Sequence, residues 1–120
     1  MDFIINEAGA KIYENIEHHK YLYIPILDGE DDQGVVYQVM SAALYRNHKH
    51  AIVTVREGDR KATAYRVPDD LYNWVESLIR LNIKGNIRMP LMIEFCMKEN
   101  HLYAKVVERL EWKAATHIHG

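Results

Sequence analysis

Histidine is the residue with the clearest chemical potential in this chain, since seven of the 120 residues are histidine. Two H-x-H pairs stand out, His48 with His50 and His117 with His119. Residues two apart on a strand point to the same face, so such a pair can present two imidazoles to one metal ion. Neither pair has a carboxylate at ligand spacing or an H-E-x-x-H context. A histidine-based metal site or hydrolase is therefore the third of three hypotheses, and exposed polar residues at element ends are the alternative interpretation.

An acidic segment is the second cluster, and it contains Asp28, Glu30, Asp31 and Asp32. Its carboxylates alternate as calcium ligands can, but the glycine and the closing glutamate of an EF-hand loop are missing from their required positions. A solvated loop that leads into a helix cap explains the segment better, because a short carboxylate accepts hydrogen bonds from the free amides of a first helical turn. With four negative charges, the segment is also a candidate second surface for a partner.

Nucleophilic catalysis has little support in the sequence. Ser41 and Ser77 lie in segments with helical patterns, and neither has the G-x-S-x-G context of a nucleophile elbow. The single cysteine, Cys96, falls in an expected strand, where a free cysteine usually behaves as a small buried hydrophobe. The glycines stand alone, so no phosphate-binding loop is visible. We therefore expect a protein that is not an enzyme and carries no cofactor.

The strongest candidate surface is the basic segment from Arg46 to Val67, which holds six Lys and Arg against two acidic residues. A two-residue turn at Gly58-Asp59 would fold its second part, residues 51–67, into a hairpin. The predicted pairs are Arg56 with Lys61, Thr54 with Thr63, and Ile52 with Tyr65. In this register one face is small and apolar, and the other is polar and open to a partner. The candidate contact residues are Arg46, Lys49, His50, Arg56, Lys61, Tyr65 and Arg66.

Two classes of partner suit this surface. Eight tyrosines and two tryptophans supply the amphipathic aromatic surface that is enriched at protein interfaces. The first hypothesis is therefore a small non-catalytic regulator or inhibitor that binds a protein and also forms a homodimer through a sheet edge or a helix face. The second is nucleic-acid binding, with phosphates on the cations and a base stacked on Tyr65. A net charge of −2 excludes a uniformly basic nucleic-acid coat.

Length and composition set the general class of the protein. An apolar content of 48% and a charged content of 27% are typical of a globular chain. One cysteine excludes an internal disulfide. The first residues show no basic leader with an apolar run, and no run reaches the roughly 18 residues of a membrane helix. We expect a single domain over residues 1–120 in the cytoplasm, with no membrane partner and with residues 114–120 frayed.

The elements of the first half are predicted from apolar spacing. Ala8, Ile12 and Ile16 recur every four residues, which predicts a helix over residues 6–18. Residues 21–27 predict a strand, and Pro25 indicates that it lies at a sheet edge or carries a bulge, because proline cannot donate to a ladder. Residues 35–44 repeat at helical spacing, although their β-branched opening also suits a strand.

The second half gives clearer signals. Pro68 and two aspartates open a helix, and its apolar stripe consists of Leu71, Trp74, Val75 and Leu78. A turn at Glu99-Asn100 closes a second hairpin. Its predicted pairs are Met97 with Leu102, Phe95 with Ala104, Ile93 with Val106, Glu94 with Lys105, and Cys96 with Tyr103. The expected fold class is α+β: an antiparallel or mixed sheet made of two hairpins and one N-terminal strand, with about three helices packed mainly on one face.

Overall fold

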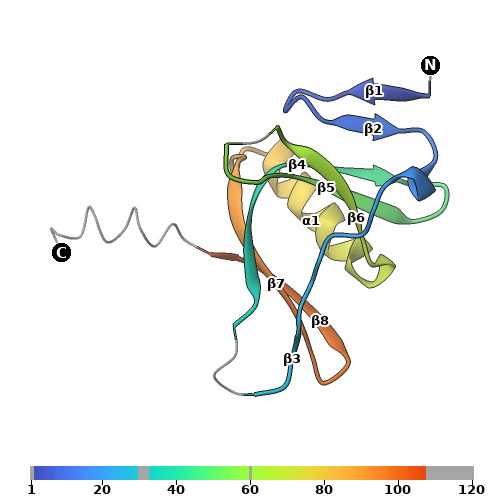
Figure 1. The fold of residues 1–120 in the computed structure, drawn as a ribbon. Helices are drawn as coiled ribbons and strands as arrows, with labels where there is room; N and C mark the ends of the chain where they lie inside the picture. Colours follow the sequence, from blue (N-terminus) through green and yellow to red (C-terminus); the bar gives the residue numbers. More distant parts are fainter. Residues whose placement is uncertain (1, 30–32, 60, 108–120) are drawn as a thin grey trace, which may run out of the picture.

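The structure is a computed structural model that describes residues 2–29, 33–59 and 61–107 (Figure 1). The described residues form a mixed six-stranded sheet, a separate two-stranded sheet and one α-helix, so the predicted α+β class is confirmed. The large sheet consists of β3 (Ile26–Leu27), β4 (Val35–Tyr45), β5 (His50–Arg56), β6 (Thr63–Val67), β7 (Leu91–Lys98) and β8 (His101–Val107). The small sheet is a hairpin of β1 (Phe3–Ile5) and β2 (Lys11–Tyr13).

β4 joins the two halves of the large sheet. Its residues 35–39 pair with β7, and its residues 38–45 pair with β5. The register shifts between Val39 and Ser41, which marks a bulge. The expected helix over residues 35–44 is therefore wrong. The β-branched residues at its start fit a pleated strand, and pairing on both edges outweighs the helical spacing that the sequence also shows.

One face of the large sheet is covered by a helical segment, in which the 3₁₀ turn η2 (Asp69–Leu71) continues into α1 (Tyr72–Ile83) (Figure 1). The predicted stripe is confirmed, because Leu71, Val75 and Leu78 are buried against the sheet. Gly85 follows the helix in the left-handed conformation, at φ +81°. The expectation of about three helices is wrong, since the described part of the chain holds only this α-helix and the short 3₁₀ turns.

The opposite face carries a second, smaller core beneath the hairpin of β1 and β2 (Figure 1). Ala10 and Ile16 pack there against three buried residues: Ile52 on β5, Ala64 on β6, and Ala62 in the connection between these strands. These contacts place the N-terminal hairpin over β5 and β6, where the sequence predicted an open polar face. The sheet is thus covered on both sides at this end.

The helix predicted over residues 6–18 is wrong, because of the three residues spaced four apart Ala8 lies in a turn, Ile12 in β2 and Ile16 in a short 3₁₀ turn. Gly9 turns the chain at φ +88°, a conformation that favours glycine. Asn6 Oδ1 supports the turn by accepting hydrogen bonds from the amides of Ala8 and Ala10, each 3.0 Å long. The helical part of this segment is the single turn η1 (Ile16–His18).

β5 and β6 form the predicted hairpin, but the register differs by one residue. Val53 pairs with Tyr65 and Thr54 with Ala64, because the connection between the strands is longer than two residues. A shift of one residue exchanges the two faces of a strand. The shift places Ala64 opposite Thr54, on the face that the N-terminal hairpin covers and where Asn6 Nδ2 donates to the Thr54 hydroxyl. Thr54 is therefore only 1% exposed, and the predicted open face of this hairpin is wrong.

The hairpin of β7 and β8 has the predicted register at every pair. Glu99 and Asn100 form its turn at φ +51° and +66°, and Lys105 Nζ lies 3.9 Å from Glu94 Oε1. β3 runs parallel to β7 at the edge of the sheet, which confirms the edge position expected from Pro25. The strand itself is shorter than predicted, and Tyr21 contributes only an isolated bridge to Arg66.

Candidate functional site

A groove of about 470 Å³ lies between the N-terminal hairpin and β6. We call it the β2–β6 groove. Its lining combines buried small residues with exposed lysines. The buried small residues are Ala10, Ala62 and Ala64, and the exposed lysines are Lys11, Lys20 and Lys61. Among the described residues, no Asp or Glu lines this groove, so its charged groups share one sign.

The outer edge of β6 faces this groove. Arg66 donates its amide to the carbonyl of Lys20 and accepts from the amide of Leu22, each over 2.9 Å. Backbone groups alternate between the two edges of a strand, so those of Ala64 point to the same side as those of Arg66. The Ala64 carbonyl lies 3.2 Å from His19 Nδ1, and by the same alternation the Ala64 amide belongs to the outer edge of β6.

β2 contributes a second backbone edge. The carbonyl of Ala10 and the amide of Glu14 bond toward β1, to Asn6 and Asp2. The alternation along the strand therefore turns the backbone groups of Lys11 and Tyr13 away from β1. The β2–β6 groove thus has one strand edge on each side, together with the lysine side chains.

His19 links these two edges at the end of the groove. The Tyr13 amide donates to Nε2 over 2.9 Å, so Nε2 carries a lone pair and Nδ1 donates to the Ala64 carbonyl. The ring is 7% exposed and neutral in this arrangement. Burial lowers the pKa of His19, the bond to Ala64 opposes this, and the charges of His18 and Arg66 lower the pKa further.

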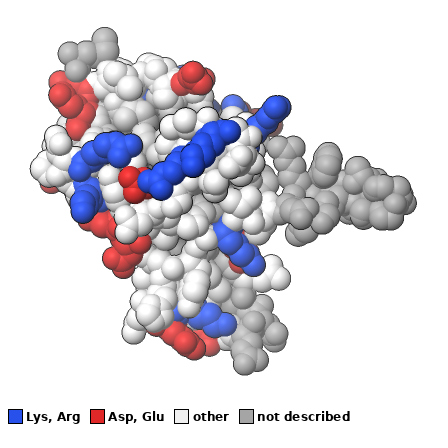
Figure 2. Space-filling view, turned by 180° about the vertical axis from the view of Figure 1, so that it is seen from behind, with Lys and Arg blue, Asp and Glu red and all other residues white. Residues whose placement is uncertain are grey.

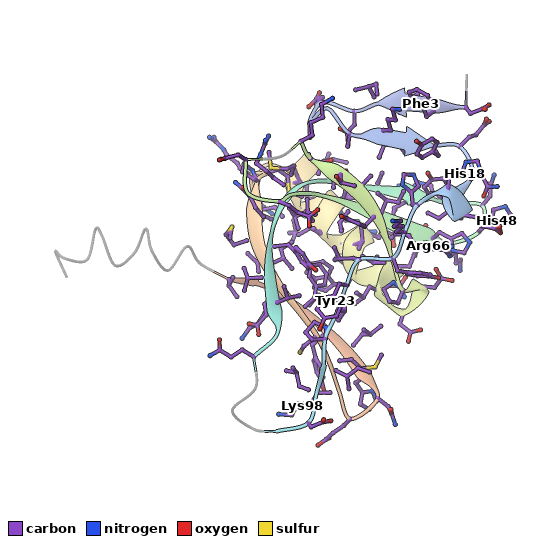
Figure 3. The ribbon with its side chains drawn as sticks, viewed as in Figure 1. Phe3, His18, Tyr23, His48, Arg66 and Lys98 are labelled. Carbon is purple, nitrogen blue, oxygen red and sulfur yellow. The ribbon has the colours of Figure 1, made fainter. Side chains whose placement is uncertain are left out.

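Aromatic rings hold two cations near the groove. The Arg66 guanidinium lies 4.4 Å from the centre of the Tyr21 ring, and Lys11 Nζ lies 4.8 Å from that of Phe3. Arg66 Nε is buried and has no hydrogen-bond partner among the described residues. Figure 3 shows Arg66, His18 and His48 on the same side of the molecule, while Lys98 lies at the far end of the β7–β8 hairpin.

The seven predicted contact residues do not form one surface. Arg46, Lys49 and His50 lie at the connection from β4 to β5, and Arg56 and Lys61 lie at the opposite end of the β5–β6 hairpin. At about 3.3 Å per residue, the two ends of β5 are about 20 Å apart. A partner that contacts all seven would have to span the whole strand.

Several of these residues already have partners within the chain. Arg46 Nη1 lies 3.6 Å from Glu76 Oε2, and His50 Nδ1 lies 2.8 Å from Asp69 Oδ1. The Tyr65 hydroxyl donates to Glu57 Oε1 over 2.7 Å. Of the seven, the β2–β6 groove brings together Lys61 and Tyr65.

The predicted metal ligands are only partly described. The rings of His48 and His50 are 6.0 Å apart, and His50 is engaged by Asp69. Within residues 2–29, 33–59 and 61–107, no group of three or more His, Cys, Asp and Glu side chains could hold a metal ion. His117 and His119 lie outside the described residues, as do three acidic-patch residues, Glu30, Asp31 and Asp32. The fourth, Asp28, follows β3.

Lys11 was missed in the sequence because residues 6–18 were predicted to form a helix, and His19 and Lys20 were missed because they lie between that predicted helix and the strand predicted over residues 21–27. The alternation of K-I-Y, with Lys11 and Tyr13 on one face and Ile12 on the other, was the available signal for a strand. Figure 2 shows the face opposite to that of Figure 1, where blue and red groups are interspersed.

Comparison of the chain with protein families, with curated proteins and with solved structures finds no match in any of the three. In the part of the chain that the structure describes, no helix has the length and apolar character required to cross a membrane.

Proposed function

We propose that this protein is a small non-catalytic binding domain that acts through protein–protein contacts as a regulator or inhibitor, and that its contact surface is the β2–β6 groove. The observation that carries the proposal is the lining itself. Lys11, Lys20 and Lys61 are exposed around buried alanines, and the described lining contains no carboxylate. A groove of one sign attracts a partner of the opposite sign and raises the rate of encounter.

An acidic protein segment fits this groove better than a nucleic acid does. Sequence-tolerant nucleic-acid binding relies on aromatic rings on which bases can stack. The Tyr13 ring is packed edge-on against His18 and His19, with centroids 5.5 and 5.2 Å away, and the Tyr65 hydroxyl is engaged by Glu57. The lysines are therefore better supported as partners of carboxylates than as part of a stacking surface.

Panning a random-peptide library against the whole chain tests this proposal. We expect the enriched peptides to be rich in Asp and Glu and to bind more weakly as salt is raised. The K11E/K20E/K61E variant should lose at least about tenfold in affinity for them, measured by fluorescence anisotropy. The K84E/R88E/K98E variant carries the same charge change outside the groove and should retain wild-type affinity.

Three results would refute the proposal. The first is a library that yields no acidic peptides. The second is equal loss of affinity in the two charge-reversed variants, which would place the effect in net charge rather than in the groove. The third is binding of single-stranded DNA or RNA oligonucleotides that is tighter than binding of the acidic peptides and is lost in K11E/K20E/K61E. That result would favour nucleic-acid binding instead.

A homodimer formed through a sheet edge is also proposed. The outer edge of β8 exposes half of Tyr103 and almost half of Val106, and such strand edges readily pair with a second chain. Sedimentation equilibrium should show a dimer that the substitution Val106→Lys dissociates. A wild-type chain that sediments as a strict monomer would remove this proposal.

A further inference from the structure

We infer that the β2–β6 groove takes its partner as an extended acidic strand added to the outer edge of β6. This inference rests on the proposed function and specifies the backbone conformation and the residue pattern of the ligand. Peptides that extend a sheet in this way obtain affinity from main-chain hydrogen bonds and specificity from alternate side chains.

The protein's own chain already uses the edge in this manner. Residues 20–22 run parallel to β6, and Lys20 and Leu22 make both backbone bonds of Arg66. This pairing ends at Arg66, and His19 then approaches the Ala64 carbonyl through its ring rather than through its backbone. The Ala64 amide is thus left for a strand that enters the groove.

The shape of the groove suits a strand. Its volume of about 470 Å³ lies within the range of roughly 300–1,000 Å³ that is usual for ligand sites. The buried lining residues Ala10, Ala62 and Ala64 have the smallest side chains after glycine, so a backbone can approach closely. The Lys11 backbone on β2 supplies a second edge opposite to β6.

The charges specify which residues the strand carries. Side chains alternate between the two faces of a strand. Lys11, Lys20 and Lys61 are exposed, whereas the alanines are buried, so one face of the ligand meets cations and the other meets small apolar groups. The expected ligand has Asp or Glu at every second position and small apolar residues such as Val between them. A phosphate backbone would satisfy the lysines but would not alternate in this way.

Backbone methylation tests this inference. The probe is a fluorescein-labelled peptide of alternating Glu and Val, in three forms: unmodified, N-methylated at the Glu residues, and N-methylated at the Val residues. Methylation removes backbone donors and leaves every side-chain charge in place. We expect at least one methylated form to bind about tenfold more weakly to the whole chain. The unmodified peptide should also slow hydrogen exchange at the Ala64 amide about tenfold, with no change at the control amide of Ala51 on β5.

The outcomes separate the two proposals. If both methylated forms bind as the unmodified peptide does, and Ala64 exchange is unchanged while K11E/K20E/K61E still abolishes binding, strand addition is wrong and the proposed function stands. If that lysine variant binds all three forms like wild type, or none of the three peptides binds the wild-type chain, strand addition at the groove is also wrong. A single-stranded oligonucleotide that slows Ala64 exchange more than the peptide would likewise overturn the inference.

Discussion

Two polar side chains attach the N-terminal hairpin to the sheet. His19 bridges the Tyr13 amide to the Ala64 carbonyl. Asn6 donates from Nδ2 to Thr54 Oγ1 over 3.1 Å and to Ser41 Oγ over 3.3 Å. A buried polar group that loses its partner costs about 1–3 kcal/mol, so both side chains contribute to stability out of proportion to their size.

The first prediction concerns pH and His19. The pKa of His19 in the folded chain is lowered, so the unfolded chain binds the proton more readily. The stabilisation is therefore complete above the unfolded pKa of about 6.5 and is lost as the pH falls from there through the folded pKa. We expect urea denaturation to show a free energy of unfolding that declines below about pH 6.5 in wild type and declines less in His19→Gln.

A control for that series is His101→Gln, because His101 is exposed at the start of β8. This variant should keep the pH dependence of wild type. If His19→Gln and wild type declined in parallel, His19 would not be the titrating group.

The second prediction concerns Asn6. Asn6→Ala removes both side-chain donors to the sheet and both acceptor contacts in the Gly9 turn. We expect a loss of about 1–3 kcal/mol in the free energy of unfolding, measured with urea. Asn15→Ala is the matched control, since the Asn15 side chain accepts one exposed bond from the Glu17 amide. An equal or larger loss in Asn15→Ala would contradict this role of Asn6.

At the scale of elements, the turns decide what the sequence can predict. Every pair of the β7–β8 hairpin was predictable, because Glu99-Asn100 is a two-residue turn that fixes its register. The β5–β6 hairpin was predictable as an element but not in register, because its longer connection leaves the pairing open. The register of this hairpin is instead set by the burial of both faces of β5, and that burial depends on segments distant in the sequence.

The site was less predictable than the fold. Lys61 and Tyr65 were identified from the basic hairpin. Lys11 was missed because the apolar spacing of residues 6–18 predicted a helix in place of the β1–β2 hairpin, and His19 and Lys20 were missed because they lie after that predicted helix, where no element was expected. α1 was predictable because Pro68 and Gly85 bound a clear stripe. β4 was not, because its strand state depends on partners on both edges.

The third prediction uses the turn between β7 and β8. Both Glu99 and Asn100 have positive φ, which costs energy in residues that have a Cβ. The double substitution Glu99→Asn with Asn100→Gly should stabilise the protein by about 0.5–1 kcal/mol in urea denaturation. The same Asn→Gly change at Asn73, within α1, should instead destabilise it. A destabilised turn variant would contradict this geometry.

At the scale of the whole molecule, the sheet is covered by two unequal cores. The core under α1 contains fully buried large residues such as Phe95, Ile93 and Val39. The core under the N-terminal hairpin depends on smaller residues, Ala10, Ala62 and Ala64, together with Ile16 and Ile52. Burial stabilises in proportion to apolar area, so the hairpin is the more weakly held layer.

The fourth prediction follows from this difference. Hydrogen exchange followed by NMR should show that the amides of β1 and β2 open with a lower free energy than the ladder amides of β5 and β7. Acidification below about pH 6.5 should lower the opening free energy of the hairpin amides further, because His19 binds a proton more readily in the opened hairpin than in the closed one. Equal opening free energies for both groups of amides would contradict the two-layer description.

The position of β4 has a consequence for how the chain folds. Its pairing with β5 closes a short loop, but its pairing with β7 joins Val35 to Phe95, which are separated by most of the described chain. Closing a long loop costs entropy before its contacts form, and high contact order slows folding. The two local hairpins, β5–β6 and β7–β8, are therefore expected to form early. The docking of β7 onto β4 then brings the two halves together and sets the overall folding rate.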